Sequence, residues 1–319
     1  MPSDFFAVHN DKFLAILGEE PTLELLAENE YYAFAHEAGV FIPERNELFI
    51  TSNRIQNPSG EQRVQITKVQ LSNASPSGSV TCEELSVPIP MANGGINYKD
   101  GIIICAQGSI DEPSGLYYMS SKPPYNFNSV NDVVVHSDGT IWFTDPIYGY
   151  EQGYRPKPRL PNQVYRYNPA DDSIRAVADG FGRPNGICFS PDGKTVYITD
   201  TDWIHGDGTT DDTRPSSIYA FDVVLYHKQP FLTNRRLFAM ADSTIPDGIK
   251  CDLEGNVYSG CGDGLNVWSP GGDLLGRILV KGGVANFCFG RDGEIFLLNE
   301  HRLWRTKLNG NVKGALLGI

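Results

Sequence analysis

One pattern occurs three times in the sequence: NDVVVHSDGTIWFTD (131–145), NGICFSPDGKTVYITD (185–200) and DGIKCDLEGNVYSGC (247–261). Each copy begins with a polar residue and continues through a short apolar run, a D-G or E-G pair and a second apolar run. A D-G pair between two runs of strand-forming residues is a strong hairpin signal, because Gly accepts the positive φ that a tight turn requires. The pattern therefore predicts a β-hairpin in each copy.

Three weaker copies begin at Glu37, Asn93 and Ala285, which brings the number of expected hairpins to six. A second pair of strand-like runs follows the stronger hairpins, at 162–179, 216–242 and 265–282. Repeats of four strands at a spacing of ~40–60 residues are typical of the blades of a β-propeller.

The last repeat has three clear strands, which end at RLWRTKL (302–308). We expect TLELLAE (22–28) to supply the fourth strand, so that the N- and C-terminal strands together close the last blade. The predicted fold is therefore all-β: a single six-bladed β-propeller domain over residues 1–319, with residues 1–20 as an N-terminal lead-in. A β-sandwich, or two small β domains, is the alternative architecture.

Composition narrows the classes of partner. The formal net charge of −13 would repel a phosphate backbone, so we expect no nucleic-acid partner. No run approaches the ~18 apolar residues of a membrane span, so we expect no membrane partner. Asp4 stands where a signal peptide carries basic residues, and the six cysteines include no C-x-x-C pair. These features predict a cytoplasmic protein with buried free thiols, and they predict no particular oligomeric state.

The first residues of the aligned hairpins point to the chemistry of a site. All of them except Ala285 are carboxylates or carboxamides: Glu37, Asn93, Asn131, Asn185 and Asp247. The innermost strand of a propeller blade begins near the central channel, so these oxygens would converge as the ligands of a hard divalent cation do, with Ca²⁺ as the leading candidate. Ordinary turn chemistry is the alternative explanation of the N-D, N-G and D-G pairs. A turn does not need Glu37, so we favour the metal site.

Several motifs also carry a family resemblance. HEAGVF (36–41), SVNDVVV (129–135), RPNGI (183–187) and IPDGIKCDLEGNVY (245–258) resemble the gluconolactonase/regucalcin family of six-bladed propellers. The similarity to fungal aldonolactone and D-pantonolactone hydrolases is closer still, in NGG (93–95), DPIYGY (145–150) and GCGDGLNVWSPGG (260–272).

The resemblance implies a divalent ion held by Glu37, Asn131, Asn185 and Asp247. It also implies a lactonase in which the ion polarises the lactone carbonyl and Asp247, as the candidate base, activates the attacking water. The Arg that regucalcin-like members often carry two residues before the Asn is Ser129 here, which argues against their preference for sugar lactones.

The substrate would be a small-molecule lactone. Its candidate binding residues are Asn93, Tyr148, Trp203 and Arg54, most of them in loops that follow the second strands. Inter-blade packing, or a solvated surface position for Arg54, is the alternative explanation of these side chains.

Two other functions stay open. A propeller of this kind could serve a biosynthetic pathway by hydrolysing, cyclising or isomerising a bulkier lactone or ester, because function depends on the site rather than on the fold. A non-catalytic interaction propeller is the second alternative. A serine hydrolase is disfavoured, since the sequence has no G-x-S-x-G motif.

Overall fold

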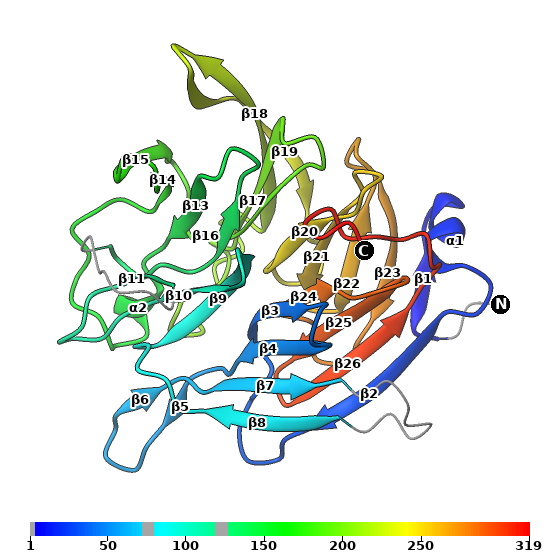
Figure 1. The fold of residues 1–319 in the computed structure, drawn as a ribbon, viewed down its shortest axis with the longest axis horizontal. Helices are drawn as coiled ribbons and strands as arrows, with labels where there is room; N and C mark the ends of the chain where they lie inside the picture. Colours follow the sequence, from blue (N-terminus) through cyan, green and yellow to red (C-terminus); the bar gives the residue numbers. More distant parts are fainter. Residues whose placement is uncertain (1–3, 72–79, 119–126) are drawn as a thin grey trace. The chain divides into compact units, whose positions relative to one another are not determined.

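The computed structural model describes residues 4–71, 80–118 and 127–319. The chain divides into two compact units: the first unit is Met1–Pro88 with Lys250–Ile319, and the second unit is Ile89–Ile249. Each of the six predicted hairpins forms two neighbouring strands of its own antiparallel sheet (Figure 1). We number these sheets blades 1 to 6 in chain order.

The first unit contains blades 1, 5 and 6. Blade 1 consists of β3 (Glu37–Ile42), β4 (Glu47–Thr51), β7 (Ile66–Gln70) and β8 (Thr81–Leu85). Blade 5 consists of β20 (Ile249–Cys251), β21 (Val257–Cys261), β22 (Gly264–Trp268), β23 (Leu274–Leu279) and, as a fifth strand, β1 (Phe6–Val8). Blade 6 consists of β24 (Asn286–Phe289), β25 (Glu294–Asn299), β26 (Arg302–Lys307) and β2 (Thr22–Glu28). A small separate hairpin is formed by β5 (Ile55–Gln56) and β6 (Gln62–Arg63).

The second unit contains blades 2, 3 and 4. The described strands of blade 2 are β9 (Ala92–Tyr98), β10 (Gly101–Ala106) and β11 (Gly115–Tyr118). Blade 3 consists of β12 (Val133–Val135), β13 (Ile141–Asp145), β14 (Gln163–Asn168) and β15 (Ser173–Ala178). Blade 4 consists of β16 (Pro184–Phe189), β17 (Thr195–Asp200), β18 (Ser217–Tyr226) and β19 (Gln229–Met240).

The hairpin of blade 3 shows why the D-G pairs predict the turns correctly. Gly139 has φ +84°, a conformation that side-chain-bearing residues rarely adopt. The carboxylate of Asp138 accepts a hydrogen bond from the backbone N–H of Thr140 at 2.9 Å, which fixes the other half of the turn. The strands then pair in register, with Val133 opposite Phe143.

The predicted closure of the last blade is confirmed. Strand β2 pairs antiparallel with β26, from Thr22 opposite Lys307 to Glu28 opposite Arg302. The hydroxyl of Thr306 also donates to the carbonyl oxygen of Thr22 at 2.8 Å. Strand β2 therefore completes blade 6.

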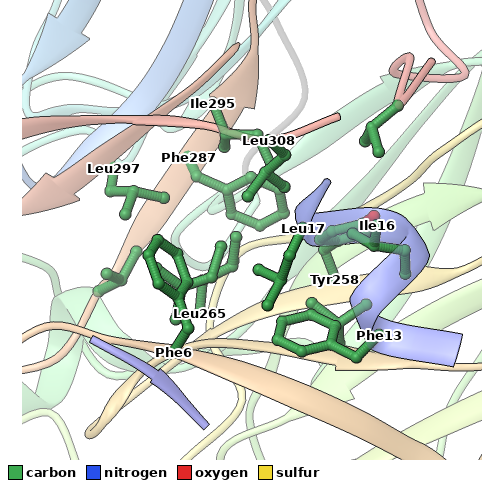
Figure 2. Close-up of a cluster of buried hydrophobic side chains, with 14 of the residues drawn as sticks. Phe6, Phe13, Ile16, Leu17, Tyr258, Leu265, Phe287, Ile295, Leu297 and Leu308 are labelled. Carbon is green, nitrogen blue, oxygen red and sulfur yellow. The ribbon is translucent and has the colours of Figure 1, made fainter. Parts of the chain in front are cut away.

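The N-terminal lead-in takes part in the core of the first unit (Figure 2). Phe13 of α1 (Lys12–Leu17) is fully buried in one cluster with Tyr258 of β21 and Phe287 of β24. A Cβ at Gly276 would lie 2.1 Å from the Phe13 ring, so the ring occupies the space that a side chain on β23 would need.

Apart from α1, the described residues contain one further helix, α2 (Tyr148–Glu151), and neither helix is long and apolar enough to cross a membrane. The six cysteines are free; five are buried as predicted, and Cys82 is exposed. The single domain over 1–319 and the cytoplasmic location stay predictions.

Candidate functional site

In the second unit, the first residues of successive blades lie against one another through their backbones. The N–H of Gly94 in blade 2 donates to the carbonyl oxygen of Asn131 in blade 3 at 2.9 Å. A Cβ at Gly186 in blade 4 would lie 2.5 Å from the carbonyl oxygen of Asp247. Only a residue without a side chain allows this approach, which explains the Gly of the N-G pair.

Two threonine hydroxyls make further links between the blades. Thr144 Oγ1 donates to the carbonyl oxygen of Asn185 at 2.6 Å, and Thr199 Oγ1 donates to the carbonyl oxygen of Asp247 at 3.0 Å. Neither threonine is among the residues predicted from the sequence. The signal that could have found them is the T-D pair that ends both second strands at the same repeat position.

Asn131 is the predicted ligand whose environment is most unusual. The residue is 3% exposed, and its backbone N–H donates to the carbonyl oxygen of Thr144 at 3.0 Å. Its carboxamide oxygen is buried and has no hydrogen-bond partner within the part of the chain that the structure describes. An unsatisfied buried acceptor is costly, and an ion or an ordered water is the usual explanation. This oxygen therefore fits a cation ligand.

Asn185 lies beside Tyr148, the first residue of α2. The phenol hydroxyl is hydrogen bonded to the hydroxyl of Thr201 and to the side chain of Asn185. Burial raises the pKa of Tyr148 strongly, while the bond from Asn185 works in the opposite direction, as expected when the amide nitrogen donates to the phenol oxygen. The carboxamide oxygen of Asn185 is then left to act as a ligand.

Asp247 belongs to the same group of residues. Its side-chain Oδ1 has no contact with solvent, and its negative charge raises the pKa of the Tyr148 phenol further. Asn185 and Asp247 thus both interact with the side chain of Tyr148.

Glu37 belongs to the first unit, where it is buried at the start of β3. The side-chain nitrogen of Asn286, the first residue of β24, donates to Glu37 Oε2 at 2.6 Å. Asn286 in turn accepts a hydrogen bond from Lys250 Nζ at 3.2 Å. A carboxylate held in this way by an amide has its orientation fixed.

The other residues predicted to bind substrate lie in different environments. Asn93 is buried in β9, one residue before the Gly94 that contacts Asn131. Trp203 is half-buried and donates from Nε1 to Asp212 at 2.8 Å. Arg54 is exposed in the loop after β4 of the first unit.

A buried arginine ties together the two loops that carry Tyr148 and Trp203. Arg183 pairs with Glu151 at the end of α2 and with Asp202, which directly precedes Trp203. Burial opposes ionisation of Glu151, but its bonds to Arg183 outweigh this effect and lower the pKa of Glu151. The loops that carry Tyr148 and Trp203 are therefore held together by charge-assisted hydrogen bonds.

Asp145 and Asp200 end the second strands of blades 3 and 4 and support the backbone that enters the site. Asp145 accepts the N–H groups of Asn128 and Ser129 at 2.9 and 2.7 Å. Asp200 accepts those of Gly182 and Arg183 at 3.1 and 2.8 Å. Burial raises the pKa of Asp145 to about 7.

No group of three or more His, Cys, Asp or Glu side chains suited to a metal ion occurs in the described ranges. The predicted set contains only two carboxylates, Glu37 and Asp247, and its other two members are amides. A hard cation such as Ca²⁺ accepts both kinds of oxygen.

Comparison with known proteins identifies the family. The model of the SMP-30/Gluconolactonase/LRE-like region matches residues 64–298. The chain belongs to the SMP-30/gluconolactonase/LRE-like family. Lactonohydrolase oryL of Aspergillus oryzae is 31% identical over 321 residues, which cover 90% of this chain and 70% of the relative. The gluconolactonase of Zymomonas mobilis is 30% identical over 199 residues, which cover 57% of this chain and 51% of the relative.

A solved structure of a gluconolactonase from Xanthomonas campestris matches 96% of this chain and 95% of its own, with a TM-score of 0.73 and 25% identity. The predicted fold class, an all-β six-bladed propeller, is confirmed, and so is the predicted family. The named relatives are hydrolases that open lactones, which confirms the predicted enzyme class.

Proposed function

We propose that this protein is a divalent-metal-dependent lactonase that hydrolyses a small lactone, of the aldonolactone or pantolactone type, to its hydroxy acid. The observation that carries the metal dependence is the buried, unpartnered carboxamide oxygen of Asn131 among the described residues. Asn185 and Asp247, which both interact with Tyr148, supply further oxygen donors in the same unit.

Asn131, Asn185 and Asp247 would hold the ion, and Glu37 is proposed as the fourth ligand on the resemblance of HEAGVF. Ca²⁺ is the preferred ion, because all the donors are hard oxygens. When bound, the cation supplies Lewis acidity at the lactone carbonyl and stabilises negative charge on its oxygen.

The protein's own groups would then manage the proton and the orientation of the substrate. Asp247 takes a proton from water as the water oxygen bonds to the carbonyl carbon. The ring C–O bond breaks, and the proton passes to the leaving alkoxide to complete the hydroxy acid. Tyr148 keeps its own proton at neutral pH, because its pKa is raised, and holds the Asn185 amide in place.

We assign substrate binding to Asn93, Tyr148, Trp203 and Arg54. Tyr148 and Trp203 would provide walls, and the Arg183 pairs with Glu151 and Asp202 keep the loops that carry them in position. Walls that do not need to be ordered on binding lower the entropic cost of holding a lactone.

The test is hydrolysis followed by pH-stat on aldonolactones, pantolactone and dihydrocoumarin, with EDTA-treated protein before and after addition of Ca²⁺. We expect activity only with added cation, and a loss of at least about 100-fold in Asp247→Ala because both a base and a ligand are removed. Asp222→Ala is the matched control, since Asp222 on β18 bonds to Asn234 and Arg236 on β19, and neither of these is a predicted site residue.

Each other outcome selects a different function. Cation binding without turnover of any of these lactones would favour a pathway enzyme acting on a bulkier lactone or ester. Full activity in EDTA would contradict the metal dependence. Failure both to bind a cation and to hydrolyse any lactone would favour the interaction propeller.

A further inference from the structure

The hydroxyl of Thr144 connects blade 3 to the predicted ligand of blade 4. Thr144 is fully buried in β13. Its Oγ1 accepts a hydrogen bond from the N–H of Asp132 at 3.1 Å and donates to the carbonyl oxygen of Asn185 at 2.6 Å. Asp132 directly follows Asn131, so one hydroxyl touches the backbones of two neighbouring predicted ligand segments.

The hydroxyl of Thr199 repeats this arrangement one blade further on. Thr199 is also fully buried, in β17. Its Oγ1 accepts from the N–H of Gly186 at 2.7 Å and donates to the carbonyl oxygen of Asp247 at 3.0 Å. Gly186 directly follows Asn185. Asn131, Asn185 and Asp247 are thus connected in order by two hydroxyls in equivalent positions.

The strands do not provide this connection themselves. The pairing of β16 with β17 shifts register between Pro184 and Ile187, so Asn185 and Gly186 fall within an irregular part of the ladder. Asp247 precedes β20, which begins at Ile249. A segment without regular ladder bonds must satisfy its backbone groups in another way, and the hydroxyls do so here.

Blades 5 and 6 have no threonine at the equivalent position. Gly260 of blade 5 stands at the threonine position, and a Cβ there would lie 2.8 Å from the carbonyl oxygen of Ala285, where blade 6 begins without a polar side chain. In blade 6 the position is taken by Leu298, and Glu37 is held instead at its carboxylate by Asn286. A threonine hydroxyl therefore links to the backbones of Asn185 and Asp247, whereas the carbonyl oxygen of Asn131 accepts from the N–H of Gly94.

We propose that Thr144 and Thr199 are positioning residues of the cation site, which set the spacing of the side-chain oxygens of Asn131, Asn185 and Asp247 by fixing the backbones that carry them. This inference rests on the proposed metal-dependent function. A cation requires its ligands at defined distances, so a small displacement of Asn185 or Asp247 weakens binding even when the fold is kept.

The test is calorimetric titration of EDTA-treated protein with Ca²⁺, together with the melting temperature of the metal-free protein. The variants are Thr144→Val and Thr199→Val, which remove only the hydroxyl, and Thr199→Ser, which restores it. Thr306→Val is the matched control: Thr306 is fully buried and donates to a carbonyl oxygen, that of Thr22, but the bond joins β26 to β2 away from any predicted ligand.

We expect each of the two site variants to weaken Ca²⁺ binding by about 10- to 100-fold, as outer-shell substitutions at metal sites do. Thr199→Ser should recover most of the affinity. Thr306→Val should lower the melting temperature without changing the dissociation constant. If Thr199→Val does not fold, Thr144→Val and Thr199→Ala provide the same comparison.

Two results would overturn the inference, and they are distinguishable. Wild-type affinity in both valine variants, with a melting temperature lowered as in Thr306→Val, would show that the threonines serve stability only. No binding of Ca²⁺, Mg²⁺ or Mn²⁺ to the wild type would show that the proposed cation site is itself wrong.

Discussion

The carboxylate of Asp145 is buried at the end of β13, where it accepts two backbone N–H groups just before the Asn131 segment. Burial disfavours its charge and raises the pKa to about 7, although the two N–H donors oppose this effect. A carboxyl whose pKa is higher in the folded state than in the unfolded state makes its full contribution to the free energy of unfolding at low pH, where it is protonated in both states. That contribution is lost as the pH rises from its ordinary value near 3.8 to about 7.

We therefore expect Asp145→Asn to change the pH dependence of unfolding. Relative to the wild type, the free energy of unfolding of the variant should increase between pH 4 and pH 7 by on the order of 4 kcal/mol, because the variant carries no buried charge. Urea unfolding at several pH values measures this difference. Asp222→Asn is the control, and its free energy of unfolding should fall relative to the wild type as the pH rises. Hydrogen bonds from Asn234 and Arg236 lower the pKa of Asp222, so the charged carboxylate stabilises the wild type. Parallel pH profiles for Asp145→Asn and the wild type would contradict the argument.

At the scale of elements, α1 shows how a short helix can be held by tertiary packing. Six residues cannot form a stable helix on their own in water, so the contacts of its apolar face must hold it. Phe13 is fully buried over Gly276 and Ile16 and Leu17 are buried in the same cluster, whereas Leu14 is 47% exposed.

Phe13→Ala should accordingly lower the free energy of unfolding by about 3–5 kcal/mol, the usual cost of removing a buried Phe. Leu14→Ala, in the same helix and with the same kind of truncation, should change it by less than about 0.5 kcal/mol. Chemical denaturation of the two variants measures the contrast. Equal losses would mean that α1 is not docked through Phe13.

The extent to which this molecule can be predicted from its sequence depends on the range of each interaction. The hairpins are predictable because a D-G pair and its flanking apolar runs are local. The pairing of β2 with β26 is predictable by counting, since the last repeat lacks one strand. The links from Thr144 to Asn185 and from Thr199 to Asp247 join residues 41 and 48 positions apart, and no local pattern specifies their partners.

Other parts of the molecule lack a sequence signal of sufficient strength. The strand β1 is only three residues long, and so short an apolar run does not reveal that it pairs with β23. The different surroundings of Asn131 and Asn185 also have no local sequence signal. The buried, unpartnered oxygen of Asn131 and the bond of Asn185 to Tyr148 depend on the packing of several blades rather than on the N-D and N-G pairs themselves.

For the whole molecule, the proposed cation site predicts a link between metal and stability. A ligand that binds only the folded state at 100 times its dissociation constant stabilises that state by about 2.7 kcal/mol. Calorimetric melting with Ca²⁺ and with EDTA should therefore show a higher transition temperature with Ca²⁺. NaCl at equal ionic strength is the control, and an equal shift with NaCl would mean that screening of the net charge of −13 is responsible.

The pairing of β2 with β26 also has a consequence for biosynthesis. Residues 22–28 leave the ribosome long before their hydrogen-bonding partner, 302–307, is made. Blade 6 can therefore be completed only after residues 302–307 have been made, and until then β2 has an unpaired edge that other strands could occupy. Among the described strands, β2 thus has the longest delay between its own synthesis and that of its partner, so we expect its edge to need shielding in the nascent chain.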